Sequence, residues 1–274
     1  MRKKAIKWID WTRSEELHCL KDILQPFSAR SARLLEIGGG NGFLARQLTE
    51  MGFEVVSIDP HPRQPSHFPV RAGTCRKLEF DDNSFDVIFS SNVLEHIEEL
   101  PAALEEMKRV LKPQGIMVHT MPTPFTTLLT MLTQPIGYLF GVGFVLNQLG
   151  RKIIASCKRK GKSATGKTGA SNLPSTGKSL NRQDLGAAVK MLNPLRLIIS
   201  PPHGISCSCR AELKDWTPGA WRQRLEQQHL QVKETIELPL AYSRNAVLPF
   251  RLVGLRRRLA RKGKTSCIAY VIQA

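Results

Sequence analysis

Short apolar runs alternate with stretches of helical periodicity over most of the chain. Runs of this kind are typical of strands buried on both faces, whereas apolar residues three and four apart are typical of helices packed on a sheet. The runs that predict strands lie at 33–37, 53–58, 68–72, 85–90, 115–120, 230–236 and 266–272. Strands that alternate with helices indicate βαβ units. We therefore predict an α/β fold, with a Rossmann-like, mostly parallel seven-stranded sheet and helices on both faces.

Local signals mark the ends of several predicted helices. Ser14 precedes two acidic residues and an apolar periodicity that continues to Leu24, and Pro26 should end this helix. Thr217 and Pro218 stand at the start of another helix, as N-cap and as first helical residue.

The alternating pattern lapses after the fifth predicted strand. We divide the chain into an N-terminal helical lead-in (1–30), a core (31–121), an insertion (122–182) and a C-terminal part that completes the sheet (183–274). The insertion begins with an uncharged, Thr- and Leu-rich stretch, broken by Pro and Gly, and continues as a Lys/Gly/Ser/Thr-rich loop. The uncharged stretch fits three interpretations: a lid over a ligand crevice, a membrane-interface segment, or a membrane span.

The charge of the chain is concentrated in two segments. The 274 residues include 40 Lys and Arg against 23 Asp and Glu, a formal net charge of +17. Residues 151–183 hold nine basic side chains and residues 238–274 hold eight, with no acid in either segment, so the rest of the chain is neutral. The second segment places Leu252, Leu255 and Leu259 on one helical side among arginines, which favours contact with an anionic membrane surface.

Cysteine usage favours a cytoplasmic protein. None of the six cysteines forms a C-x-x-C pair, and no zinc-type spacing surrounds Cys207 and Cys209. The basic residues after Met1 are not followed by the apolar stretch of a secretory signal. We expect reduced thiols and a cytoplasmic location, with peripheral membrane association as an option.

A glycine-rich turn follows the first predicted strand and opens a helix. It contains Gly38, Gly40 and Gly42, and Asp59 ends the next strand. Glycines let the main chain turn sharply and approach a ligand closely, and a carboxylate at the end of the second strand can accept both hydroxyls of a ribose. A dinucleotide loop would need a third glycine at position 43, which is Phe43.

The pattern Glu-x-Gly-x-Gly-x-Gly from residue 36 resembles motif I of the class I S-adenosylmethionine-dependent methyltransferases, in particular those similar to methyltransferase type 11. The resemblance continues through Val56–Pro60, Lys77–Ile97 and Glu105–Gly115, in order and at family spacing. It implies S-adenosylmethionine as cofactor, held by Glu36, Gly38, Gly40, Gly42, Asp59, Pro60, Thr74, Cys75, Ser90 and Ser91. Many relatives have Asp where this chain has Thr74, so the resemblance is weakest around the adenine.

Asp86 and His96 lie in the matching region, and we expect structural roles for both. Asp86 is expected to stabilise the end of the sheet. Some quinone-pathway relatives carry a metal-binding Glu-x-x-Glu-His, but Asn92 replaces its first Glu in this chain. We therefore expect His96 to form a pocket wall or a helix start, and we predict no metal site.

A formal P-loop pattern, Gly161 to Thr168, lies in the Lys/Gly/Ser/Thr-rich loop. A phosphate-binding loop needs a strand before it and a helix after it, and the flanking sequences here predict neither. We attribute the match to composition.

The sequence thus predicts methyl transfer to a small acceptor that is lipid-like or lipid-linked. A hydroxyl acceptor would need a general base, for which His119, His203 and Glu212 are candidates. An RNA methyltransferase is the first alternative, although no RNA-binding module or base-methylation signature stands in the chain, and nucleic acid is the less favoured partner. A second alternative is a cofactor-binding interaction module without catalysis.

Overall fold

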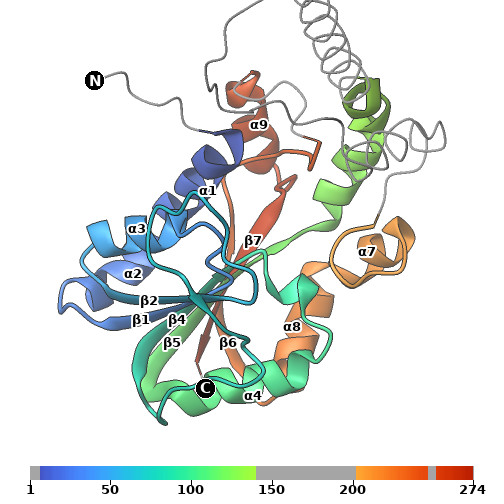
Figure 1. Ribbon diagram of the computed structural model, residues 1–274. Helices are drawn as coiled ribbons and strands as arrows, with labels where there is room; N and C mark the ends of the chain where they lie inside the picture. The colour runs from blue at the N-terminus through green and yellow to red at the C-terminus, as the bar shows by residue number, and fades with distance from the viewer. Residues whose placement is uncertain (1–6, 140–201, 246–250, 274) are drawn as a thin grey trace, which may run out of the picture. The chain divides into compact units, whose positions relative to one another are not determined.

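The computed structural model describes residues 7–139, 202–245 and 251–273 (Figure 1). The chain divides into two compact units, one formed by Met1–Thr130 with Pro201–Ala274 and the other by Met131–Ser200. The formal P-loop pattern and the basic loop fall outside the described residues. The candidate site lies in the first unit.

One seven-stranded sheet organises the first unit, which confirms the predicted fold class. Its strand order is β3-β2-β1-β4-β5-β7-β6. The strands are β1 (Arg33–Ile37), β2 (Glu54–Asp59), β3 (Arg71–Ala72), β4 (Phe85–Ser91), β5 (Leu111–Pro122), β6 (Gln231–Glu237) and β7 (Cys267–Gln273). Strands β1 to β5 are parallel, and β7 runs antiparallel to both β5 and β6. The order reverses between β1 and β4, and ligands of open α/β sheets bind at such a point.

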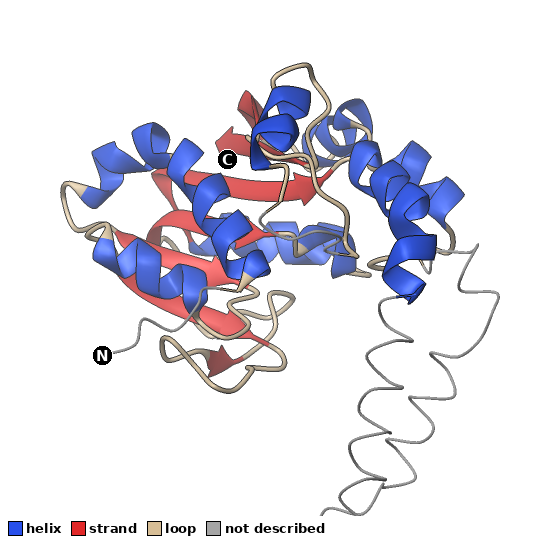
Figure 2. Cartoon of the chain, turned by 90° about the horizontal axis from the view of Figure 1, so that it is seen from above, coloured by secondary structure: helices blue, strands red, loops and turns tan. Residues whose placement is uncertain are grey.

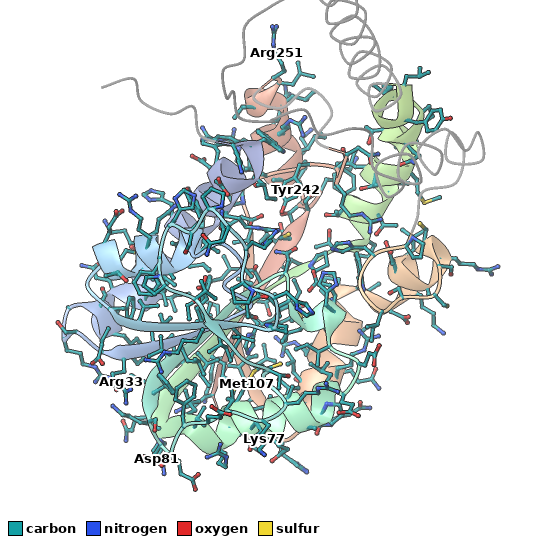
Figure 3. The ribbon with its side chains drawn as sticks, in the orientation of Figure 1. Arg33, Lys77, Asp81, Met107, Tyr242 and Arg251 are labelled. Atoms are coloured by element: carbon teal, nitrogen blue, oxygen red, sulfur yellow. The ribbon has the colours of Figure 1, made fainter. Side chains whose placement is uncertain are left out.

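Helices cover both faces of the sheet (Figures 1 and 2). The helices are α1 (Trp8–Cys19), α2 (Lys21–Ser28), α3 (Phe43–Glu50), α4 (Leu100–Val110), α7 (Cys209–Asp215), α8 (Pro218–Glu226) and α9 (Val253–Ala260), with a 3-10 turn η1 (Leu94–His96). One core layer joins Leu34, Val87 and Phe89 to α1–α3, and the other joins Leu35, Ile88 and Met117 to α4 and α8. Tyr242 and Met107, labelled in Figure 3, belong to these two layers respectively.

The N-terminal helices differ from the prediction. Instead of one helix ended by Pro26, the structure has α1 and α2, and Pro26 lies inside α2. Pro26 removes one helical bond, the one its N–H would have donated to the Asp22 carbonyl, but the helix continues for two residues and the Ala29 N–H still donates to the Gln25 carbonyl. At α8, by contrast, the Thr217 hydroxyl accepts from the Ala220 N–H and Pro218 is the first helical residue, which confirms both predictions.

A further helix occupies residues 124–139 after β5. Its described part includes exposed apolar side chains such as Leu128 in the first unit. Within the described ranges no helix has the length and apolarity to cross a bilayer, and residues 140–149 of this stretch lie outside those ranges.

Candidate functional site

The glycine loop follows β1 and lies against the end of β2. Gly38, Gly40 and Gly42 have φ of +76°, +56° and +72°, the left-handed region that favours glycine. The Gly38 and Gly39 N–H groups donate to the Ile58 carbonyl at 2.8 and 3.0 Å. Side chains are excluded here because a Cβ at Gly39 would stand 1.9 Å from Ser57 Oγ. The sequence therefore needs glycine at these positions to bring the loop onto β2.

Asp59 stands beside this loop, as its spacing predicted. Its Oδ2 accepts from the Gly40 N–H at 2.9 Å, and its Oδ1 accepts from the His61 N–H at 2.7 Å. Pro60 follows as an exposed residue. The main chain thus fixes the carboxylate at the carboxyl end of β2, near the place between β1 and β4 where the strand order reverses.

Glu36 lies in β1, directly before the glycines. Its side chain is buried, and Ser57 Oγ donates to Glu36 Oε2 at 2.5 Å. Burial raises the pKa of Glu36 to about 7, more than the Ser57 hydrogen bond lowers it. Glu36 also lies close to the loop, since a Cβ on Gly39 would stand 2.8 Å from Glu36 Oε2.

Ser90 and Ser91 end β4 and face partners from β5. Ser90 Oγ lies 2.8 Å from His119 Nδ1, and Thr120 Oγ1 donates to Ser91 Oγ at 3.1 Å. Burial lowers the pKa of His119 to about 4, and His119 Nε2 has no hydrogen-bond partner in the described structure. His119 was predicted at the end of the fifth strand, but β5 continues to Pro122 because it pairs with β7.

The segment after β3 contains Thr74 and Cys75. Thr74 forms an isolated antiparallel bridge with Lys77, its hydroxyl accepts from the Arg76 N–H, and the Cys75 side chain is buried. The turn therefore offers few free polar side-chain atoms. A contact between these residues and an adenine ring stays a prediction.

Glu212 is fully buried and anchors three segments of the first unit. It accepts from Thr127 Oγ1 at 2.7 Å, from Arg244 Nη2 at 3.1 Å, and from the His203 N–H. Arg244 Nη1 also donates to Glu212 Oε1 at 3.4 Å, so each carboxylate oxygen accepts from two donors, which suits a structural anchor better than a proton acceptor. Asp86 is likewise held by Arg33 N–H and by the side chain of Lys112, in agreement with the expected structural role.

His203 lies next to residues that the sequence separates widely from it. Its ring packs edge-on against His96, with centroids 4.5 Å apart, and against Trp216 at 6.0 Å. Burial lowers the pKa of His203 to about 4. The structure thus joins His203 to the η1 turn through its ring and to Glu212 through its N–H, whereas His119 lies in β5 beside Ser90.

Glu95 is a candidate that the sequence analysis missed. Its side chain is fully buried, and neither carboxylate oxygen has a hydrogen-bond partner among the described residues. Burial raises its pKa to about 7. The available signal was an acid between apolar neighbours, Leu94 before it and Ile97 shortly after, in a segment that follows a strand end.

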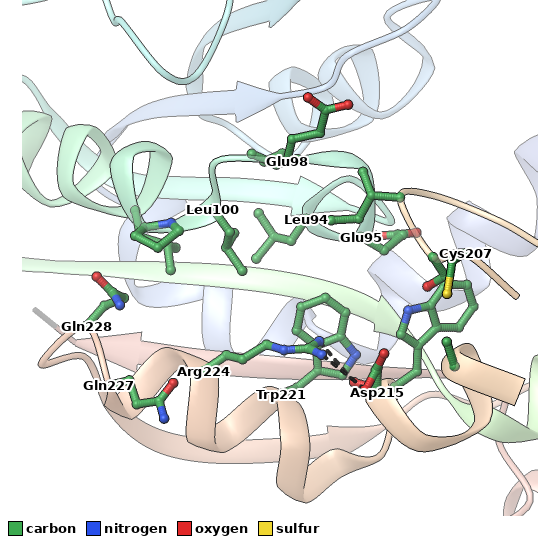
Figure 4. Close-up of a pocket in the computed structure, with 17 residues that line it drawn as sticks. Leu94, Glu95, Glu98, Leu100, Cys207, Asp215, Trp221, Arg224, Gln227 and Gln228 are labelled. Carbon is green, nitrogen blue, oxygen red and sulfur yellow. Dashed lines mark hydrogen bonds and ion pairs between the residues drawn. The ribbon is translucent and has the colours of Figure 1, made fainter.

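A cavity of about 450 Å³ opens beside Glu95 (Figure 4). Its apolar wall is formed by Leu94, Leu100, Leu104, Ile205, Trp216 and Trp221. The rest of the lining is polar and includes Glu95, Glu98, Asp215, Arg224, Gln227 and Gln228. Arg224 Cζ lies 4.8 Å from the Trp221 ring centroid, Arg224 Nη2 lies 3.8 Å from Asp215 Oδ1, and Trp221 Nε1 has no hydrogen-bond partner within the described structure. A cavity in which an apolar wall meets polar groups is typical of a small-molecule site.

Part of the core of this chain is similar in sequence to known proteins. Residues 35–119 match the family model of a methyltransferase domain. An uncharacterized methyltransferase of Mycobacterium sp. (strain KMS) is 42% identical over 94 residues, which cover 31% of this chain and 36% of the relative. The biotin biosynthesis bifunctional protein BioHC of Cellvibrio japonicus is 35% identical over 98 residues, 33% of this chain and 20% of that protein. The chain thus matches about a third or less of the length of these relatives.

The fold has a counterpart among solved structures. An S-adenosylmethionine-dependent methyltransferase from Mesorhizobium loti superposes with a TM-score of 0.50 at 15% identity, over 95% of this chain and 98% of that one. The likeness concerns the fold. The sequence matches show that residues 35–119 form a methyltransferase domain, and the sheet order and the glycine loop are those expected from the resemblance to the class I S-adenosylmethionine-dependent enzymes.

Proposed function

We propose that the protein transfers a methyl group from S-adenosylmethionine to a small, lipid-like or lipid-linked acceptor by direct in-line displacement. The observation that carries the proposal is the proximity of two sites. Val93 contacts the glycine loop, since a Cβ on Gly38 would lie 2.3 Å from it. The next two residues, Leu94 and Glu95, line the cavity. One turn of chain thus borders both the loop and the cavity.

The residues around the loop fit the cofactor. The loop offers a main-chain cradle at Gly38, Gly40 and Gly42, and Asp59 offers a fixed carboxylate for ribose hydroxyls. In this proposal Glu36 holds the loop, and Ser90 and Ser91 border the methionine end. Bound S-adenosylmethionine supplies a methyl group already activated on a sulfonium. The protein has to align the acceptor and exclude water.

A hydroxyl acceptor would also lose a proton. Among the candidates from the sequence, Glu212 is engaged by donors from three residues and the His203 ring packs on His96. His119 Nε2 has no partner in the part of the chain that is described. We therefore propose His119 as the first proton acceptor to test.

The apolar cavity and the surface of α9 support a lipid-like acceptor. Leu252 and Leu255 are 59% and 50% exposed, and Arg251, Arg257 and Arg258 are exposed around them. Apolar side chains among arginines fit the interface of an anionic membrane. The likeness to a biotin biosynthesis protein favours a small molecule over RNA, which remains the alternative acceptor.

Calorimetry with S-adenosylmethionine tests the core of the proposal. The wild type should bind, and Asp59→Asn should bind at least tenfold more weakly because it loses the ribose-binding charge. Asp22→Asn makes the same chemical change at an exposed position of α2 and should bind like the wild type. Absence of binding to the wild type would overturn the proposed function. Transfer of labelled methyl to lipid or RNA fractions then distinguishes the acceptors.

A further inference from the structure

Three potential metal ligands from two distant segments meet at the η1 turn. Within the described ranges, Glu95, His96 and His203 each present one ligand atom within 4.8 Å of those of the other two. Glu95 Oε1 and His96 Nε2 are 3.9 Å apart. Ligand atoms around one zinc ion lie roughly 3.3–3.5 Å apart. A small rotation of the His96 side chain would bring the ligand atoms to this spacing. The side chain has room to move because 45% of it is exposed.

The Glu95 carboxylate supplies an independent sign of a ligand. It is fully buried, and neither oxygen has a hydrogen-bond partner in the described structure. A buried carboxylate without hydrogen bonds is costly, and proteins normally pair it or use it to coordinate a metal. A cation between Glu95 and the two imidazoles would satisfy it.

The main chain holds His203 against this carboxylate. The Ile205 N–H donates to the Glu95 carbonyl at 3.0 Å, and the His203 N–H donates to Glu212. Between them, Gly204 has φ of +61°, and a Cβ there would lie 2.1 Å from the Glu95 carbonyl oxygen. The close approach therefore depends on glycine, and the three side chains are positioned by the fold.

Two arginines act electrostatically on this cluster, and each has its own carboxylate. The charges of Arg13 and Arg244 both act to lower the pKa of His203, and the charge of Arg13 also acts to lower the pKa of Glu95. Arg13 Nη1 lies 2.6 Å from Glu16 Oε2, and Arg244 Nη2 lies 3.1 Å from Glu212 Oε2. Their charge is therefore largely balanced outside the cluster, and Glu95 remains available to a cation.

We propose that Glu95, His96 and His203 bind a divalent transition-metal ion of the zinc type. One carboxylate and two imidazoles are an established ligand class for such ions, and three protein ligands leave a coordination position open. The predicted absence of a metal rested on Asn92, but the third ligand comes from His203, beyond the insertion. Glu95 also lines the cavity, so the ion lies at its wall. This inference does not depend on methyl transfer.

Metal titration of the full chain tests the site. After treatment with a chelator, equilibrium dialysis against Zn²⁺ should give one ion per chain. Glu95→Gln and His203→Ala should each weaken binding by at least a hundredfold, since each removes a ligand. His18→Ala, an exposed histidine on α1, should bind like the wild type. Circular dichroism establishes that each variant is folded, and His96→Asn replaces any variant that is not.

Cobalt substitution separates this site from binding by thiols. Cys207 is exposed and lies four residues after His203. The Co²⁺ form should show visible ligand-field bands without thiolate charge-transfer absorption, and Cys207→Ser should leave them unchanged. Unaltered zinc affinity in Glu95→Gln and His203→Ala, or loss of binding in Cys207→Ser, would overturn the proposal. Neither result bears on S-adenosylmethionine binding, which is measured separately.

Discussion

Ser57 in β2 donates its hydroxyl to the Glu36 carboxylate in β1, across 2.5 Å between Oγ and Oε2. The two residues are register partners of adjacent parallel strands. This bond joins the strand that leads into the glycine loop to the strand that presents Asp59. It lies in a buried place, so the protonation of Glu36 affects the stability of the core.

Glu36→Gln should change how stability depends on pH. Burial raises the pKa of Glu36 from 4.5 to about 7, so the folded state holds its proton more tightly than the unfolded state. This contribution is fully present below about pH 4.5 and is lost as pH rises to about 7. The loss is at most about 3 kcal/mol. Denaturant unfolding at several pH values should therefore show a flatter profile for Glu36→Gln.

The control for this prediction is Glu79→Gln, which changes an exposed glutamate in the same part of the chain, residues 31–121. Its pH profile should follow that of the wild type. Identical profiles for the wild type and Glu36→Gln would contradict the buried, protonated state of Glu36 near neutral pH.

Gly42→Ala should destabilise the loop and weaken cofactor binding. Gly42 has φ of +72°, and an added Cβ would lie 2.5 Å from the Phe68 carbonyl oxygen. Left-handed strain alone costs about 1 kcal/mol or more, and the backbone of residue 68 would also have to move. Thermal unfolding and calorimetry with S-adenosylmethionine measure the two effects.

Gly219→Ala is the matched substitution, since nothing lies within 4 Å of a Cβ there and the residue is in α8. It should be neutral or stabilise the protein by up to about 1 kcal/mol. Equal melting temperatures for the two alanine variants would show that Gly42 is not conformationally required.

Thr217→Ala should lower stability by about 1 kcal/mol, because the Ala220 N–H loses its acceptor at the start of α8. Thr217→Ser keeps a hydroxyl and should retain most of the stability. Chemical denaturation of the two variants beside the wild type gives the comparison, and a loss that is the same for serine and alanine would exclude the capping bond as its cause.

Leu255→Gln should reduce flotation with anionic vesicles several-fold, because it removes an exposed apolar side chain from the arginine-rich surface of α9. Ile9→Gln, a similar change at an exposed position of α1, should leave flotation unchanged. Vesicles of 30% phosphatidylserine at low and at 0.5 M salt would show the electrostatic part. Tight RNA binding without flotation would favour the RNA alternative.

The sequence predicted correctly those features of the fold that neighbouring residues determine. Each apolar run became a strand, and Thr217 with Pro218 began α8, because burial and capping are encoded by neighbouring residues. Asp59 was also predictable, since parallel order brings the ends of β1 and β2 together.

Other features depend on residues far apart in the chain and escaped prediction. β5 extends to Pro122, two residues beyond its predicted end, where Cys267 of β7 pairs with it. The segment that carries His203 lies against Glu95, since the Ile205 N–H donates to the Glu95 carbonyl. Periodicity contains no information about such long-range contacts.

The position of β7 between β5 and β6 has a consequence for the growing polypeptide on the ribosome. β7 is translated after both of its neighbours, so an open edge of β5 persists until residues 267–273 leave the exit tunnel. Exposed strand edges recruit other chains. Nascent copies of this protein should therefore depend on chaperones until the final pairing forms, however stable the parallel strands already are.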